Sequence, residues 1–448
     1  MTSKTQQPAT FKPSGPLSGK ISVPGDKSIS HRALILSALA VGKSQITGLL
    51  EGEDVLATAA ALRAMGAKIE KKGDVWTVHG VGVGGLMQPE NAIDMGNSGT
   101  STRLLMGLVA SHGISTTFIG DASLSKRPMG RVIDPLSQMG ADIQARETAD
   151  HKACLPLSVR GICPAIPLEY RLPVASAQVK SAILLAGLNT PGITRIIEPV
   201  LTRDHSETML KGFGAEISVE TDADGCRIIS LTGEAELKPQ KIKVPGDPSS
   251  AAFLVVAGLI IPGSDIIIEN VGINPTRAGL FDILQEMGGD ISLTKKRTVG
   301  GETVADIHVK YSALTGIDVP ANIAPSMIDE FPILFVAAAI AEGQTTTTGL
   351  SELRVKESDR LSQMAKGLSL LGVTLTEKDD GLIIEGSGGK PLSGGRAKPV
   401  IETALDHRIA MSFAVAGLVT KSGLALDDIT PVETSFPGFK NLLMTLAS

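Results

Sequence analysis

One short pattern recurs five times along the chain, and its even spacing constrains the fold more than any other feature. In each copy, a predicted amphipathic helix ends at a glycine that turns the chain into an alternating strand. Glycine suits this place because it readily adopts the left-handed conformation that closes a helix. The five glycines are separated by 74, 74, 74 and 84 residues: Gly66, Gly140, Gly214, Gly288 and Gly372. A sixth predicted helix reaches residues 442–446, where the chain stops before a strand.

A second series runs half a period out of phase with the glycines. Six polar clusters each precede a strongly apolar, alanine-rich segment. The clusters are residues 27–28, 97–100, 176–178, 247–250, 326–329 and 406–408, and the apolar segments are 33–40, 104–110, 183–188, 251–261, 333–341 and 409–419. A helix that is apolar on all sides is buried. Each repeat therefore predicts one buried helix, one amphipathic surface helix and short strands.

Six such repeats predict an α/β fold of two similar domains. Units of about 74 residues are longer than the usual 20–50 residues of a solenoid repeat, so three units per domain sharing three buried helices fit better. The near-copies Val-Pro-Gly-Asp at 23–26 and 244–247 stand three units apart and are turn sequences. We expect hinges there, with one domain of residues 1–23 plus 244–448 and a second of residues 24–243.

The polar helix starts indicate an anion site. The beginning of a buried helix carries unpaired N–H groups and a partial positive charge. Serine, threonine and aspartate there also fit ordinary N-caps, and that alternative stays open. Basic side chains are different, because they oppose the helix dipole unless an anion offsets them. Five lie at or just inside these starts: Lys27, Arg32, Arg103, His407 and Arg408.

Two further clusters are basic. Residues 124–131 form a loop with three cations around a rigid proline, and residues 353–360 place Lys356 and Arg360 four apart with Glu357 beside them. We expect Lys356 and Arg360 on one helical face. Solvated local ion pairs, worth under ~0.5 kcal/mol each, are the alternative reading of both clusters.

Composition and motifs exclude several classes of function. The net charge of −5 and the aromatic content of 3% argue against a nucleic-acid partner. They say nothing of small anions, because a few cations focused on one cleft suffice. Residues 25–28 resemble the end of a P-loop but lack its first glycine, no Gly-x-Gly-x-x-Gly opens a helix, and no cluster has metal-ligand spacing.

The ends and the cysteines favour a cytosolic protein. Residues 1–16 lack the apolar stretch of a signal peptide, and the longest apolar run, 251–261, is too short to span a membrane. Cys154, Cys163 and Cys226 form no Cys-x-x-Cys pair and fit a reducing compartment. We expect all three to be small core residues rather than nucleophiles.

Six motifs in order give the chain a resemblance to a known family. They are Pro-Gly-Asp-Lys-Ser-Ile-Ser-His-Arg at 24–32, Gly-Asn-Ser-Gly-Thr-Ser-Thr-Arg at 96–103, Lys-Arg-Pro-Met-Gly at 126–130, Ser-Ala-Gln-Val-Lys-Ser-Ala at 176–182, Arg-Val-Lys-Glu-Ser-Asp-Arg at 354–360 and Asp-His-Arg-Ile-Ala-Met at 406–411. The chain resembles the enolpyruvyl transferases, in particular those that make 5-enolpyruvylshikimate 3-phosphate. This resemblance implies an inside-out α/β barrel in each domain, with the active site in the inter-domain cleft.

The resemblance also implies the reaction. The enolpyruvyl group of phosphoenolpyruvate (PEP) passes to the 5-hydroxyl of shikimate 3-phosphate through a tetrahedral intermediate, and phosphate leaves. It implies a cytoplasmic monomer of aromatic amino-acid biosynthesis that needs no cofactor and no metal, and binds no nucleic acid or membrane. The alternatives are an enolpyruvyl transferase acting on UDP-N-acetylglucosamine, disfavoured because the loop 121–130 has no cysteine, and a non-catalytic protein that binds phosphorylated metabolites.

The motif match implies a role for each site residue. The catalytic residues are Lys27, Asp329 as the base, and Glu357 as a proton shuttle. The shikimate 3-phosphate ligands are Lys27, Ser28, Arg32, Ser176, Ala177, Gln178, Arg203, Asp329 and Lys356. The PEP ligands are Lys27, Asn97, Gly99, Arg127, Gln178, Arg360 and Arg408.

Two departures from the family pattern resemble its divergent bacterial branch, which includes glyphosate-tolerant enzymes. Many members carry a lysine before Thr-Phe-Pro near the C-terminus, whereas this chain has Thr434 and Ser435 before Phe436, with Lys440 as the nearest replacement. Leu104 follows Arg103 where many members have proline.

Overall fold

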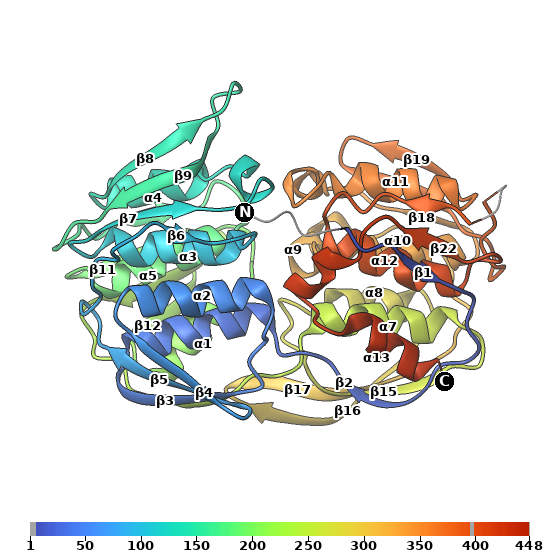
Figure 1. Ribbon diagram of the computed structural model, residues 1–448, viewed down its shortest axis with the longest axis horizontal. Coiled ribbons are helices and arrows are strands. Elements are labelled where there is room, and N and C mark those ends of the chain that lie inside the picture. The colour runs from blue at the N-terminus through green and yellow to red at the C-terminus, as the bar shows by residue number, and fades with distance from the viewer. Residues whose placement is uncertain (1–5, 395–397, 448) are drawn as a thin grey trace. The chain divides into compact units, whose positions relative to one another are not determined.

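The computed structural model describes residues 6–394 and 398–447, so the outermost residues of the first predicted domain, 1–5 and 448, lie outside it. The chain forms two compact units (Figure 1). Unit 1 contains residues 1–26 and 245–448, and unit 2 contains residues 27–244. We describe each unit by itself.

Unit 2 is built around three buried helices. They are α1 (Lys27–Leu39), α3 (Gly99–Ala110) and α5 (Ala177–Leu188). Every residue of α5 from Val179 onward is buried. Three amphipathic helices lie outside them: α2 (Glu53–Ala64), α4 (Gly130–Gln138) and α6 (His205–Gly212). The prediction that each repeat contributes one buried and one surface helix is confirmed here.

Unit 1 repeats the plan. Its buried helices are α7 (Pro248–Ile260), α10 (Phe331–Ile340) and α12 (His407–Leu418), and every residue of all three is buried. The outer helices are α8 (Gly279–Glu286), α11 (Arg360–Leu370) and α13 (Phe439–Leu446), with a short α9 (Ala324–Met327) before α10. The buried helices form the core of each unit because apolar side chains cover all their faces.

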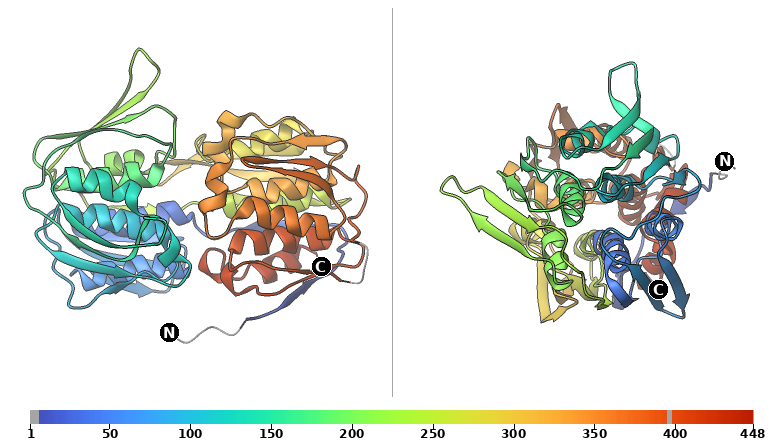
Figure 2. Two further views of the ribbon diagram at one scale, coloured as in Figure 1. Left: turned by 90° about the horizontal axis from the view of Figure 1, so that it is seen from above. Right: turned by 90° about the vertical axis from the view of Figure 1, so that its left-hand side faces the viewer.

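The three sheets of unit 2 share one topology, in which a parallel pair is followed by an antiparallel hairpin. Unit 2 has β14-β3-β5-β4, β6-β7-β9-β8 and β10-β11-β13-β12. Their bounds are β3 Val41–Thr47, β4 Lys68–Lys72, β5 Val75–Val81, β6 Ile93–Asp94, β7 Ser115–Ile119, β8 Asp142–Glu147, β9 Ala153–Arg160, β10 Glu169–Arg171, β11 Ile193–Glu198, β12 Ile217–Thr221, β13 Arg227–Thr232 and β14 Lys241–Lys243. The hairpins β8–β9 (teal) and β12–β13 (yellow-green) extend outward from unit 2 (Figure 2).

Unit 1 has the sheets β2-β15-β17-β16, β18-β20-β19 and β21-β22-β1. Their bounds are β1 Ala9–Phe11, β2 Ser18–Ser22, β15 Asp265–Gly272, β16 Asp290–Val299, β17 Glu302–Lys310, β18 Gln344–Thr346, β19 Thr374–Lys378, β20 Gly381–Glu385, β21 Val400–Ile401 and β22 Leu424–Leu426. The strand β1 pairs antiparallel with β22, so the N-terminal segment completes the sixth repeat. Sequence reading left that repeat without a partner strand, because its two parts lie at opposite ends of the chain.

The repeated glycines close the outer helices as predicted. Gly66, Gly140, Gly214, Gly288 and Gly372 have φ of 99°, 101°, 91°, 92° and 81°. After α2, for example, the amide of Gly66 donates to the carbonyl of Arg63, and that of Ala67 donates to Leu62. These bonds satisfy carbonyls that the end of a helix leaves unpaired.

The two Pro-Gly-Asp segments pair with each other inside unit 1. The amide of Asp26 donates to the carbonyl of Pro245 at 2.8 Å, and that of Asp247 donates to Pro24 at 2.9 Å. The chain passes between the units at residues 26–27 and 244–245. Hinge motion about these segments stays a prediction.

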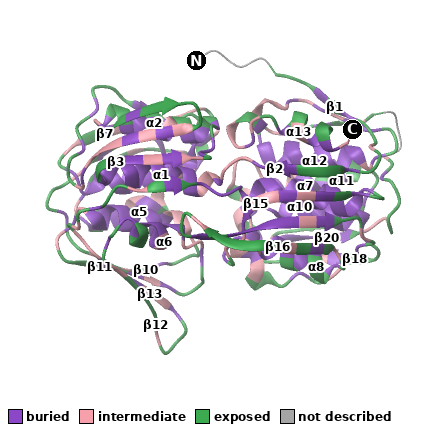
Figure 3. Cartoon of the chain, turned by 90° about the horizontal axis from the view of Figure 1, so that it is seen from below, coloured by how far each residue is buried: buried purple, intermediate pink, exposed green. Residues whose placement is uncertain are grey.

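Burial corrects one expectation. Cys154 and Cys226 are buried, but Cys163 is exposed because it lies in the surface loop that follows β9. Figure 3 shows the contrast between the buried central helices and the exposed outer loops. Within residues 6–394 and 398–447 no single helix is long and apolar enough to cross a membrane. Residues 321–327 and 331–340 reach the necessary length and apolar character only as a pair, and they meet at a bend of 119°.

Candidate functional site

The first helix of unit 2 begins with a cation beside a carboxylate. Lys27 is the first residue of α1, and its Nζ lies 3.0 Å from Oδ2 of Asp54 in the first turn of α2. Both side chains are largely buried, with 19% and 10% of their area exposed. Asp54, which the sequence did not single out, therefore holds the lysine at the helix start.

Arg32 lies one turn further along α1 and reaches across to α5 and α6. Its Nε donates to Oγ of Ser206 at 2.8 Å, its Nη2 to Oγ of Ser181 at 2.7 Å, and its Nη1 to the carbonyl of Ser28 at 3.0 Å. These three acceptors hold the guanidinium in one orientation. An arginine held in this way can bind a phosphate through parallel N–H groups.

Two arginines of unit 2, Arg103 and Arg127, lie close to the start of α3. Arg103 Nη1 donates to Oε1 of Gln178 at 3.0 Å, and Arg127 donates to the side chain and carbonyl of Asn97. An ideal Cβ on Gly99 would lie 3.0 Å from Nη1 of each arginine. Gly99 thus leaves room for both guanidinium groups. The motif match assigned no site role to Arg103, although its place at a buried helix start had marked it as an anion-site candidate.

The remaining predicted residues of unit 2 lie at the start of α5 and in the loop after β11. Ser176 is the N-cap of α5, with its Oγ accepting the amide of Val179 at 3.4 Å, and Ala177 is the first helical residue. Arg203 is half-buried in the loop between β11 and α6. Its role in binding shikimate 3-phosphate stays a prediction.

A buried ion cluster supports that loop from behind. Lys180, one turn into α5, lies 2.8 Å from Glu198 and 2.8 Å from Glu207, and its side chain is fully buried. Oε1 of Glu198 also accepts the amide of Thr202 at 3.1 Å. The cluster therefore fixes the segment just before Arg203. Lys180 stands inside the 176–182 motif, but nothing in the sequence separates a supporting lysine from a binding one.

In unit 1, Arg360 gathers three carboxylates. Its guanidinium donates to Oδ1 of Asp329 at 3.2 Å, to Oε2 of Glu357 at 2.6 Å and to Oδ2 of Asp406 at 2.8 Å, and only 1% of its side chain is exposed. Lys356 Nζ lies 3.7 Å from the same Oδ1 of Asp329. Four residues that the sequence assigned to the site, Asp329, Lys356, Glu357 and Arg360, therefore meet in one group.

Charge pairing outweighs burial in this group. Burial raises the pKa of Asp406, but the charge and hydrogen bond of Arg360 together with the charge of His407 outweigh it and hold the pKa below the ordinary value. Burial likewise lowers the pKa of Arg360, whereas Asp406, Glu357 and Asp329 raise it above the ordinary value. Asp406 and Arg360 therefore form a charged pair within this group.

The expectation that Lys356 and Arg360 share a helical face is wrong. The segment Ser351–Val355 is a 3-10 helix, Lys356 has an extended backbone with ψ of −149°, and α11 begins only at Arg360. Asp359 is the N-cap of α11 and receives the amide of Ser362, so the chain enters the helix there. Both cations nevertheless face Asp329, because the turn between the two helices brings them together.

Arg408 completes the unit 1 group. It is the second residue of α12, and its Nη1 donates to the carbonyl of Asp329 at 2.8 Å and to Oε1 of Glu330 at 3.2 Å. The prediction that residues 326–329 open the buried helix α10 is also corrected. Residues up to Met327 belong to α9, and α10 starts at Phe331 after Glu330, so Asp329 lies in the turn between two helices.

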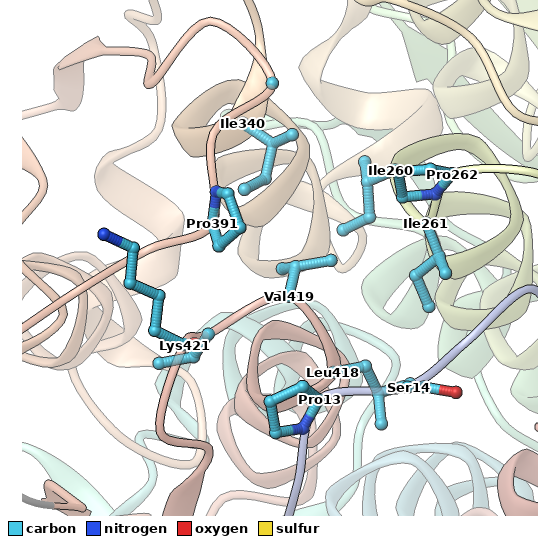
Figure 4. Close-up of a pocket in the computed structure, with 12 residues that line it drawn as sticks. Pro13, Ser14, Ile260, Ile261, Pro262, Ile340, Pro391, Leu418, Val419 and Lys421 are labelled. Atoms are coloured by element: carbon cyan, nitrogen blue, oxygen red, sulfur yellow. The ribbon is translucent and has the colours of Figure 1, made fainter.

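An apolar pocket in unit 1 lies away from this group. Ile260, Ile340 and Leu418, at the carboxyl ends of α7, α10 and α12, line a volume of about 250 Å³ (Figure 4). The site residues lie at the opposite ends of the same helices, and a helix of 13 residues is about 20 Å long. The pocket is therefore separate from the candidate site.

Three further cations that the sequence singled out lie at the surface. Lys126 and Arg131 of the basic loop are exposed, and Lys440 is an exposed residue at the start of α13. Within residues 6–394 and 398–447, no three His, Cys, Asp or Glu side chains gather in a way that could hold a metal ion.

Comparison with known proteins gives one consistent result. Residues 11–443 match the family described as EPSP synthase (3-phosphoshikimate 1-carboxyvinyltransferase). The protein named 3-phosphoshikimate 1-carboxyvinyltransferase from Zymomonas mobilis is 68% identical over 98% of this chain and 96% of its own length. That of the same name from Novosphingobium aromaticivorans is 66% identical over 98% of each.

Solved structures agree with the fold. An EPSP synthase from Acinetobacter baumannii has a TM-score of 0.85 and 48% identity over 99% of this chain and 98% of its own. The enolpyruvyl transferase NikO from Streptomyces tendae has a TM-score of 0.77 at 20% identity, covering 99% of this chain and 98% of its own, and shows the shared fold alone.

Proposed function

Because the chain belongs to the EPSP synthase family, we propose that it transfers the enolpyruvyl group of PEP to the 5-hydroxyl of shikimate 3-phosphate. The products are 5-enolpyruvylshikimate 3-phosphate and inorganic phosphate, in aromatic amino-acid biosynthesis. The observation that carries this proposal is the gathering of Asp329, Lys356, Glu357 and Arg360 in unit 1, since transfer needs acid–base groups beside cations.

The helix starts of unit 2 supply the anion ligands. Lys27, Ser28, Arg32, Ser176 and Gln178 offer a helix N-terminus, hydroxyls and cations for the phosphate and hydroxyls of shikimate 3-phosphate, with Arg203 near its phosphate. For PEP the ligands are Lys27, Asn97, Gly99, Arg127 and Gln178 from unit 2, together with Arg360 and Arg408 from unit 1.

The chemistry proceeds by addition and elimination. The oxygen of the 5-hydroxyl bonds to C2 of PEP while Asp329 takes the hydroxyl proton. At the same time Glu357 or Lys27 delivers a proton to C3 of PEP. The C2–O bond to phosphate then breaks, and the group that delivered the proton, Glu357 or Lys27, takes a proton back from C3. Phosphate leaves as the double bond is restored. Lys356 and Arg360, which flank Asp329 at 3.7 and 3.2 Å, would balance negative charge that develops beside the base.

Phosphate release with both substrates tests the proposal. The protein should release phosphate with PEP and shikimate 3-phosphate together, and not with either alone. Release with PEP and UDP-N-acetylglucosamine instead would transfer the activity to the other branch. Tight binding of both anions without release would make the chain a non-catalytic binder.

We further propose that the enzyme acts as a monomer in the cytoplasm. Light scattering coupled to size-exclusion chromatography should give a mass near 46.5 kDa. A mass of twice that value would contradict the monomer.

A further inference from the structure

Unit 1 contains a buried arginine that the motifs did not assign. Arg277 lies in the loop between β15 and α8 and is 4% exposed. Its Nη2 donates to Oδ1 of Asp247 at 3.1 Å and to Oγ of Ser249 at 2.8 Å, and lies 3.9 Å from Oδ2 of Asp26. One guanidinium therefore touches both Pro-Gly-Asp segments and the start of α7.

The contacts of Arg277 lead to two site residues. Ser249 Oγ donates to Oε1 of Glu330, which also accepts Arg408 Nη1 at 3.2 Å. Arg408 is thus two side chains away from Arg277. In the other direction, Asp26 directly precedes Lys27 in the chain. Arg277 is placed to act on the positions of both substrate cations.

The charges explain why an arginine is needed here. Burial lowers the pKa of Arg277, but Asp26, Asp247 and Glu330 outweigh it and raise the pKa above the ordinary value. Those three acids are at most 6% exposed. Without Arg277 the negative charge of these acids would act on Arg408, which already contacts Glu330. An arginine that is paired more strongly with a buried carboxylate binds a substrate anion less readily.

Hydrogen bonds of Asn274 hold the loop that carries Arg277. Oδ1 of Asn274 accepts the amide of Thr276 at 2.9 Å and its hydroxyl at 2.8 Å, while Nδ2 donates to Oε2 of Glu302 at 3.2 Å. The arginine is therefore preorganised, which is what a supporting residue of an electrostatic site requires.

We propose that Arg277 is a positioning residue for enolpyruvyl transfer. It binds the carboxylates at the Pro-Gly-Asp segments and the start of α7, and so limits the negative charge that bears on Arg408 and Lys27. This inference rests on the proposed function. It differs from a purely structural role in predicting a change in PEP use beyond any loss of stability.

Steady-state kinetics of Arg277→Met and Arg277→Lys test this inference. Arg277→Met should raise KM for PEP at least tenfold and lower kcat, whereas Arg277→Lys, which keeps the charge but loses the fork, should recover part of both. Leu284→Ala, which opens a cavity in the buried face of α8, is the matched control: it should lower the midpoint of thermal unfolding with KM for PEP unchanged.

A second variant separates charge from packing. Asp247→Asn in the Arg277→Met background removes one uncompensated carboxylate while keeping a good N-cap for α7, so KM for PEP should move back toward the wild-type value. Should Arg277→Met not fold, Ser249→Ala breaks the same relay without changing the charge and should raise KM for PEP severalfold.

The outcomes are distinct. KM for PEP within twofold of wild type in Arg277→Lys and Ser249→Ala, or no recovery in the double variant, would overturn the positioning role. Absence of phosphate release by the wild-type protein would instead overturn the proposed function.

Discussion

The two units share one backbone plan but place different chemistry at the starts of their buried helices. In unit 2, hydroxyl side chains of Ser98 and Ser176 cap α3 and α5. In unit 1, the N-cap residues of α7, α10 and α12 are the acids Asp247, Glu330 and Asp406. The starts of α3 and α5 thus carry neutral groups where unit 1 carries carboxylates, whereas α1 directly follows Asp26.

This difference separates two tasks. A neutral cap satisfies a helix amide and leaves the positive end of the helix to an external anion. Asp247 and Asp406 each accept a helix amide and also offset that charge. Glu330, by contrast, caps no amide of α10 and accepts Arg408 instead. Beside these carboxylates the site needs arginines of its own. Unit 1 supplies them as Arg277, Arg360 and Arg408, each paired with a buried acid. The starts of α3 and α5 in unit 2 are therefore suited to anions, whereas the carboxylates of unit 1 are suited to proton transfer.

The largest expected effect comes from the cation at the start of α1. Lys27→Ala should lower kcat about 1000-fold or more, because the removal of one electrostatic donor typically costs 10²–10³ and Lys27 is assigned to both substrates. The phosphate-release assay measures this loss, with Lys72→Ala on the exposed strand β4 as the surface control. Near-normal turnover of Lys27→Ala would remove unit 2 from the chemical step.

The repeat is the part of the fold that sequence predicted most completely. Glycine caps and all-apolar helices are local signals, and they gave two domains of three units and their buried helices. The sixth sheet was not predicted. The pairing of β1 with β22 joins residues more than 400 positions apart, and no local sequence pattern encodes such a contact.

The site was predictable only where a motif carried it. Asp329, Lys356, Glu357 and Arg360 were named from the sequence, although the helical face assumed for two of them was wrong. Asp54, Lys180 and Arg277 were missed as supporting residues. Their roles depend on burial and on partners from other elements, and a charged residue in a sequence gives no sign of either.

The second prediction concerns the acid of unit 1. Asp329→Asn keeps the size of the side chain but removes the base, so kcat should fall about 100- to 1000-fold. Affinity for shikimate 3-phosphate, measured by calorimetry, should change much less, since most of its proposed ligands lie in unit 2. Asp290→Asn, on the exposed edge of β16, is the control. Loss of binding in parallel with kcat would contradict the separation of tasks.

The third prediction tests whether the two arginines beside Gly99 in unit 2 contribute to PEP binding. A methyl group at Gly99 would press on Arg103 and Arg127, whose contacts described above are to neutral acceptors, so Gly99→Ala should displace them and raise KM for PEP roughly tenfold. Turnover at saturating PEP should change little. Gly113→Ala, where an added Cβ meets nothing within 4 Å, is the control. Unchanged KM for PEP would show that these arginines do not line its site.

The smallest expected effect tests whether the acids of unit 1 also stabilise it. Burial raises the pKa of Asp306 on β17, but hydrogen bonds from the amide of Asn270 and from Lys295 and Arg297 outweigh it and hold the pKa below the ordinary value. A carboxylate with a lowered folded-state pKa stabilises the fold above its unfolded pKa of about 3.9 and loses that contribution as the pH falls through the folded value.

Asp306→Asn should therefore lower the unfolding midpoint at pH 7 by a few degrees, corresponding to about 1 kcal/mol, because Asn still accepts the amide of Asn270 and the two cations are partly exposed. The difference from wild type should persist down to about pH 4 and shrink below it. In a background that lacks both Lys295 and Arg297, the substitution should cost much less. A difference that stays constant from pH 7 to pH 3 would show that packing, rather than charge, holds this part of unit 1, because only the charged pairing depends on ionisation.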